Sequence, residues 1–243
     1  MNDNFKYLKN LFYGIKSRKF IESKYYDSGA AGKMFEILIN KQLDNKCAAD
    51  FFEIELKVSS VNSKYPITLF SSFPKIYNKS FEDSIVYLIS NYGYSCDNDV
   101  KKLSICVKSN KIKYCKSGYG FMLKVSYKWN KIYLCIFYKN KITCTKFYWS
   151  FEQLYKIFEN KLKNLAYITY IQKDINGKKY IYYNDLNFYK LKDSYLLIKA
   201  IEEGVIVINF NMILYGSNNI RYHGVNFAIS YNNFHYIYEK IYK

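Results

Sequence analysis

The residue types best suited to chemistry lie between Asp50 and Lys57, in the run Asp-Phe-Phe-Glu-Ile-Glu-Leu-Lys. Its apolar residues alternate with Glu53, Glu55 and Lys57, which predicts a strand over residues 51–58 with these three side chains on one face. Carboxylates on one strand face can bind a hard divalent cation, and the cation can acidify a bound water and polarise a phosphate. A nearby ammonium group can stabilise the attacking water. The indicated chemistry is metal-dependent hydrolysis of a phosphodiester.

An acidic residue two positions before a lysine is a weak signal in a chain so rich in lysine. The same spacing begins at four other residues, Glu22, Asp44, Asp99 and Glu159. Only the triplet that begins at Glu55 also has an upstream aspartate and an alternating strand around it. The alternative interpretation is a solvated strand face with an ordinary cross-strand ion pair.

The charge of the chain favours a polyanionic partner. Its 243 residues include 37 Lys and Arg against 20 Asp and Glu, a formal net charge of +17. Clustered cations release counterions from a phosphate backbone, which favours nucleic acid over the weaker alternative of an acidic membrane. The abundance of Lys, Asn, Ile and Tyr is typical of AT-rich coding, so part of the excess carries no function. Arg18 and Arg221 are the two arginines of a chain in which lysine is the usual cation. Arginine binds guanine or phosphate in a bidentate manner better than lysine does.

Several classes of protein are excluded by composition. Apolar runs are too short to span a membrane, and charges interrupt the first twenty residues, so we expect neither a signal peptide nor an anchor and place the protein in the cytoplasm. Only two histidines occur and no C-x-x-C pair, which argues against zinc. Reduced, buried thiols are favoured over disulfides. The six cysteines are Cys47, Cys96, Cys106, Cys115, Cys135 and Cys144.

The elements around the motif are predicted from periodicity. Residues 5–15 have helical spacing, a second helix follows Gly32, a short strand covers 67–70, and 80–92 form a helix with a capping box. We expect residues 1–95 to form the catalytic region.

Residues 96–243 are predicted to form an antiparallel sheet and a DNA-recognition region, packed with the first region as one compact two-lobed unit. The fold class expected is α/β (α+β), a mixed sheet flanked by helices with an additional antiparallel meander. The predicted elements are a meander over 101–148, a helix opening at 150, a hairpin over 164–183 closed by Asn176-Gly177, a helix near 194–203, strands over 205–214 and 222–229, and a terminal helix from 231.

Two blocks of sequence resemble the MvaI/BcnI family of type II restriction endonucleases, which are relatives of the mismatch-repair nickase MutH. The resemblance implies a PD-(D/E)xK fold, a restriction-endonuclease-like mixed sheet, with Mg²⁺ dependence. It also implies a monomer that cuts or nicks double-stranded DNA. The first block is Gly32-Lys33-Met34-Phe35-Glu36, Asp50, Glu55-Leu56-Lys57 and Thr68-Leu69-Phe70, and the second is Tyr222-His223-Gly224-Val225-Asn226-Phe227-Ala228-Ile229.

The resemblance also implies a role for each matching residue. Asp50 would be the central metal ligand, Glu55 a second ligand, Lys57 the stabiliser of the attacking water, and Glu36 a helix-borne carboxylate that orients metal or water. Ala49 stands where the superfamily has proline, which leaves metal binding unaffected.

The recognition region is implied less fully. His223, with Arg221 and Tyr222 beside it, would contact DNA, and Lys33 and Thr68 are further candidates for such contacts. The sequence Arg-Tyr-His replaces a more acidic segment expected there, so the recognition sequence stays open. His235 is interpreted as structural.

The function expected is sequence-specific cleavage of double-stranded DNA, with a cognate methyltransferase acting on the same site as a further expected partner. One alternative keeps the active site in a mismatch-repair strand nickase or a junction resolvase. A second alternative, from a different class, is a non-catalytic basic nucleic-acid-binding protein in which Glu55 and Lys57 are an ordinary strand pair.

Overall fold

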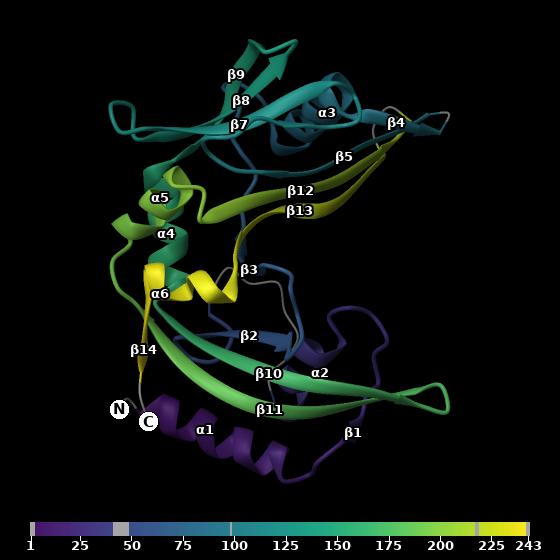
Figure 1. Cartoon of the computed structure of the whole chain (residues 1–243), viewed down its shortest axis with the longest axis vertical. Coiled ribbons are helices and arrows are strands. Elements are labelled where there is room, and N and C mark those ends of the chain that lie inside the picture. The colour runs from purple at the N-terminus through teal and green to yellow at the C-terminus, as the bar shows by residue number, and fades with distance from the viewer. Residues whose placement is uncertain (1–2, 41–48, 98, 217–218, 242–243) are drawn as a thin grey trace. The chain divides into compact units, whose positions relative to one another are not determined.

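The computed structural model describes residues 3–40, 49–97, 99–216 and 219–241. The chain divides into two compact units (Figure 1). The sequence predicts one boundary near residue 95, whereas the division is interleaved, because the chain passes between the units after residues 67, 156, 192 and 236. The first unit comprises residues 1–67, 157–192 and 237–243, and the second comprises 68–156 and 193–236.

The first unit is a five-stranded sheet with helices. Its strands follow the order β1-β11-β10-β2, and β14 also pairs with β11. Its elements are α1 (Asp3–Lys16), β1 (Ile21–Glu22), α2 (Ala30–Leu38), β2 (Ile54–Ser60), a π-helical turn (Phe158–Leu162), β10 (Asn164–Ile175), β11 (Lys178–Leu191) and β14 (Tyr238–Ile241).

The strand that carries the motif, β2, is parallel to β10, while β10 and β11 form a long antiparallel hairpin (Figure 1). Glu55 lies opposite Leu165 and Lys57 lies opposite Tyr167. The hairpin turns at Asn176 and Gly177, both with positive φ, as the Asn-Gly dipeptide predicts. The sheet is therefore mixed and flanked by helices, as expected.

The predicted first helix is confirmed as α1. Its apolar residues at helical spacing, among them Leu8 and Phe12, are buried against the sheet. α2 adds Phe35 to the same core cluster, to which β2 contributes Ile54 and Leu56. Since side chains alternate along a strand, Glu55 and Lys57 extend from the face of β2 opposite the two helices.

The motif strand begins later than predicted, at Ile54 instead of residue 51. Phe51 and Ile54 bond to each other across a tight turn, with N···O distances of 2.9 and 2.8 Å. Phe52 has a φ of 52°, which does not fit a strand. The expected alternation is therefore wrong at its start, and Glu53 lies in the turn.

The second unit contains two antiparallel sheets, with the strand orders β3-β13-β12-β5-β4 and β6-β7-β8-β9. Its elements are β3 (Ile67–Ser71), α3 (Phe81–Tyr92), β4 (Tyr94–Asp97), β5 (Val100–Val107), β6 (Lys113–Tyr114), β7 (Tyr119–Ser126), β8 (Lys131–Tyr138), β9 (Lys141–Ser150), α4 (Phe151–Ile157), α5 (Tyr195–Glu202), β12 (Ile206–Tyr215), β13 (Asn219–Ile229), a 3-10 turn (Tyr231–Asn233) and α6 (Phe234–Ile237).

The predicted meander is confirmed for β6 to β9, but the prediction that β5 belongs to it is wrong. β5 pairs with β12, more than a hundred residues later, and Leu103 lies opposite Met212. The helix predicted over 80–92 is confirmed as α3, and Ser80 caps it, since its Oγ accepts the Asp83 N–H at 3.1 Å.

The C-terminal segment corrects another prediction. The expected terminal helix is limited to the 3-10 turn and α6, and the chain then continues as β14, antiparallel to β11. The spacing of Phe234, Ile237 and Tyr238 suits a helix, but Tyr238 is fully buried and its hydroxyl donates to the Leu162 carbonyl at 3.1 Å. Tertiary packing overrides the local pattern here.

The cysteines are only partly as expected. The five described cysteines are free thiols, and Cys135 and Cys144 are buried, whereas Cys96 and Cys106 are exposed, so the expectation of burial is wrong for these two. Cys47 lies outside the described residues. Within the described ranges, no helix combines the length and the apolar character needed to cross a membrane.

Candidate active site

Asp50 is fixed beside the motif strand by a backbone contact. Its Oδ2 accepts the N–H of Leu56 at 3.0 Å. The tight turn before β2 therefore places the Asp50 carboxylate beside the strand. Asn164, at the start of β10, supports the same turn, because its side-chain amide donates to the Glu53 carbonyl at 3.2 Å. Two neighbouring parallel strands therefore hold Asp50 near Glu55.

Glu55 is a buried carboxylate with two lysines on one of its oxygens. Its side chain is 1% exposed, and Oε1 lies 2.7 Å from the Lys57 ammonium and 3.4 Å from the Lys161 ammonium. The second oxygen, Oε2, is buried without a hydrogen-bond partner. Because an unpaired buried acceptor costs about 1–3 kcal/mol, this oxygen is well suited to bind a donor or a cation.

The electrostatics of Glu55 follow from this environment. Burial raises the pKa of the Glu55 carboxyl, and the neighbouring Asp50 charge raises it further, while Lys57 and Lys161 lower it. Burial is the largest effect, so the net direction is upward. Glu55 is thus a buried carboxylate close to two cations, an environment typical of functional sites.

Lys161 was not predicted from the sequence. It lies on the π-helical turn that precedes β10. The triplet that begins at Glu159 has the same spacing as the active-site triplet and lacks its strand context, so no local signal identifies Lys161. Only the parallel pairing of β2 with β10 brings it to Glu55.

Two further candidates, Lys33 and Glu36, lie on α2. Lys33 pairs with Asp27 at 2.6 Å, with both side chains substantially exposed. Glu36 is half-buried on the same helix, next to the buried Phe35, and α2 contacts β2. The structure therefore brings Asp50, Glu55 and Lys57 together, and the catalytic role of Glu36 stays a prediction.

A divalent cation fits the chemistry of this site, although the ligand set is small. Within the described ranges, no three or more His, Cys, Asp and Glu residues are grouped closely enough to hold a metal ion. The fit rests on Asp50 and Glu55, and above all on the unpartnered buried Oε2 of Glu55. Hard cations such as Mg²⁺ use one or two protein carboxylates and complete their shell with water and phosphate oxygens.

The predicted DNA-contacting residues of the second unit lie on the paired strands β3 and β13. Thr68, Arg221 and His223 are exposed. Tyr222 is different, because its ring packs edge-on against Phe81, with centroids 5.6 Å apart, and its hydroxyl accepts the N–H of residue 225. Tyr222 therefore supports the strand that presents its two neighbours.

The His-Gly pair forms a β-bulge. Phe210 pairs with Val225 and Met212 pairs with Tyr222, so His223 and Gly224 together oppose one residue of β12. Gly224 has a φ of 92°, and a Cβ there would lie 2.8 Å from the Asn226 Oδ1. Bulges redirect side chains next to functional sites, and this one requires glycine.

We expect Gly224→Ala to lower both stability and site-specific DNA affinity. The strained φ and the close Asn226 oxygen should destabilise the fold by about 1–3 kcal/mol, and movement of the bulge should displace His223. Thermal unfolding and gel-shift titration would measure the two effects. Gly177→Ala is the matched control, since Gly177 also has positive φ but open space around it and lies in the hairpin of the first unit. Equal DNA affinity for the two variants would contradict a role of the bulge in recognition.

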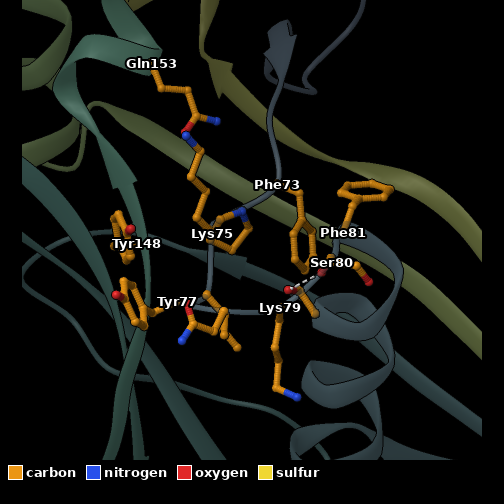
Figure 2. A pocket seen from close by; sticks show the side chains of 12 residues that line it. Phe73, Lys75, Tyr77, Lys79, Ser80, Phe81, Tyr148 and Gln153 are labelled. Atoms are coloured by element: carbon orange, nitrogen blue, oxygen red, sulfur yellow. Dashed lines mark hydrogen bonds between the residues drawn. The ribbon is translucent and has the colours of Figure 1, made fainter.

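A cavity of about 650 Å³ adjoins the bulged strand. In Figure 2 the Lys75 side chain extends towards Gln153, whereas Lys79 extends in the other direction, so the two lysines do not converge on one anion. Phe73 and Phe81, which line the cavity, also contact the Tyr222 ring. The cavity is a mixed aromatic and basic surface beside the candidate recognition strand.

A mixed sheet whose motif strand carries Glu55 and Lys57, with Asp50 held beside it from the preceding turn, is the arrangement expected of a nuclease of the restriction-endonuclease class. The sequence model of the MvaI/BcnI restriction endonuclease family matches residues 9–238, and the chain belongs to this family. The predicted family and function are thereby confirmed: the protein is a sequence-specific type II restriction endonuclease, a DNA-cleaving hydrolase.

Solved structures agree with this assignment. The chain is similar to restriction endonuclease MvaI in complex with its cognate DNA substrate, with 26% identity, a TM-score of 0.89, and coverage of 99% of this chain and 98% of the other. It is also similar to MvaI in the absence of DNA, with 27% identity, a TM-score of 0.62 and the same coverage. These likenesses confirm the predicted fold class. No curated protein matches.

Proposed function

We propose that the protein hydrolyses phosphodiester bonds of double-stranded DNA with a Mg²⁺-activated water at Asp50 and Glu55. The observation that carries the proposal is the buried, unpartnered Oε2 of Glu55, beside Asp50 and two ammonium groups. A bound Mg²⁺ would lower the pKa of a water and neutralise charge on the phosphate.

Each residue then has a distinct task. Asp50 and Glu55 hold the cation, and the Leu56 N–H keeps Asp50 oriented. Lys57 stabilises the attacking water and the negative charge that develops on the phosphate, as a preorganised cation in a dry site can do effectively. Glu36, on the adjacent helix, orients metal or water.

Recognition is assigned to the bulged strand. Arg221 and His223 read bases, and Thr68 and Lys33 contact the DNA, while other lysines supply affinity that depends on salt but not on sequence. The complex of the similar enzyme MvaI with cognate DNA supports a double-stranded substrate. We further propose that the protein acts as a monomer in the cytoplasm, together with a methyltransferase that protects the same site.

The test is incubation of the purified protein with unmethylated phage DNA and with supercoiled plasmid. With Mg²⁺ we expect discrete fragments, and with EDTA intact DNA. Asp50→Asn should also leave DNA intact, although the asparagine carbonyl can still accept the Leu56 N–H. Equal cleavage by Asp50→Asn would overturn the assignment of the site.

The plasmid separates the alternatives. Accumulation of nicked circles alone would favour a strand nickase, and cleavage of branched DNA without sequence preference would favour a junction resolvase. DNA that stays intact but bound with every variant would favour a non-catalytic binding protein.

A further inference from the structure

Lys161 lies at the carboxylate site although it is outside the motif. Its ammonium lies 3.4 Å from Glu55 Oε1, the oxygen that also contacts Lys57 at 2.7 Å. The Lys161 side chain is 22% exposed and that of Lys57 is 18% exposed, so both side chains are largely buried. The site therefore has two lysines that share one carboxylate oxygen.

The position of Lys161 is fixed by its surroundings. Phe158 and Leu162, at the two ends of its π-helical turn, are fully buried. The hydroxyl of buried Tyr238 donates to the Leu162 carbonyl, and β10 begins two residues later in register with β2. Short π-helical segments such as this continuation of α4 are rare and occur frequently at functional sites. This backbone holds the Lys161 ammonium beside Glu55.

Other ion pairs of the first and second units differ from this arrangement. Lys33 and Asp27 have side chains 43% and 51% exposed, and those of Lys156 and Glu152 are 70% and 77% exposed. Exposed pairs of this kind contribute little to stability. The carboxylate that Lys161 contacts is only 1% exposed, unlike those of the exposed pairs. A carboxylate buried in this way depends on neighbouring cations to remain charged.

We propose that Lys161 is a positioning residue of the active site: it holds Oε1 of Glu55, so that Oε2 is presented to the divalent cation and Lys57 is free to act on the substrate phosphate. The inference rests on the proposed function. With Lys161 present, Glu55 keeps a cation on Oε1 even when the Lys57 ammonium moves to the phosphate. Without it, Glu55 and Lys57 remain tied to each other.

The experiment compares the full-length wild type with Lys161→Met, Lys161→Arg and the control Lys163→Met, whose residue is exposed on the same segment. Mn²⁺ binding to the DNA-free protein is measured by electron paramagnetic resonance, and DNA cleavage by single-turnover kinetics with Mg²⁺. Thermal unfolding confirms that each variant is folded.

We expect Lys161→Met to weaken Mn²⁺ binding and to slow cleavage by about 10–100-fold each, as loss of a group that orients a metal ligand does. Arginine should restore much of both properties, and Lys163→Met should match the wild type. The sign of the Mn²⁺ effect is decisive. Removal of a cation that merely repels the metal would tighten Mn²⁺ binding.

Unchanged or tighter Mn²⁺ binding by Lys161→Met would overturn the inference. A wild type that binds Mn²⁺ but cuts no DNA would overturn the proposed function, whereas weaker Mn²⁺ binding by Lys161→Met would still support the positioning of Glu55. The two failures are therefore distinguishable.

Discussion

Lys57→Ala is expected to reduce DNA cleavage by about 10²–10³-fold at saturating Mg²⁺, the effect of removing one preorganised charge-stabilising group. Lys57 is largely enclosed and lies 2.7 Å from the carboxylate that would hold the metal, so bulk solvent cannot replace its ammonium readily. Single-turnover cleavage of a DNA carrying one site measures the loss.

The control for Lys57→Ala is Lys64→Ala, which removes an exposed lysine a few residues further along. It should alter cleavage little and lower affinity only through salt-dependent binding. Cleavage by Lys57→Ala at the rate of the control would contradict the catalytic role and favour an ordinary ion pair on the strand.

Glu55→Gln is expected to separate function from stability. Cleavage should fall by about 10²–10³-fold, because a metal ligand that contributes several kcal/mol is lost. In EDTA, the stability of the variant relative to the wild type should rise between acid and neutral pH, because the glutamine side chain has no charge to bury. The reason is that burial raises the pKa of Glu55, so the folded state disfavours its charged form.

The pH dependence of this difference has a defined sign. Below the pKa of the unfolded chain, about 4.3, Glu55 is protonated in both states and carries no penalty. As pH rises through the higher folded pKa, the native protein must ionise a buried carboxyl, and the wild type loses stability relative to Glu55→Gln. Denaturation in EDTA between pH 4 and pH 8 should show the gap opening with pH. A gap that widens towards acid would contradict burial as the main effect.

Local patterns predicted much of the fold. The amphipathic first helix, the cap at Ser80 and the Asn176-Gly177 hairpin each depend on neighbouring residues, and each is confirmed. The motif also predicted that Asp50, Glu55 and Lys57 lie together. The spacing of these three residues along one strand and the turn before it is sufficient to bring them together.

Contacts between distant segments could not be predicted. β5 pairs with β12 and the last strand pairs with β11, although their local sequences suit a meander and a helix. Lys161 reaches Glu55 only because β10 lies parallel to β2, and parallel pairing leaves no turn signature in the sequence. The start of β2 was missed because Phe52 adopts a positive φ that is uncommon for a bulky residue.

The parallel pairing of β2 with β10 also governs when the nuclease can become active during synthesis. A ribosome releases the chain from its N-terminus, so Asp50, Glu55 and Lys57 emerge long before Lys161 and β10. The second unit contributes an entire segment, 68–156, in between. A nascent chain therefore contains Asp50 and Glu55 before it contains β10, the strand that pairs with β2. Contacts between segments so far apart in the sequence form late in folding. Topology thus delays the assembly of a DNA-cutting centre until most of the polypeptide has been made.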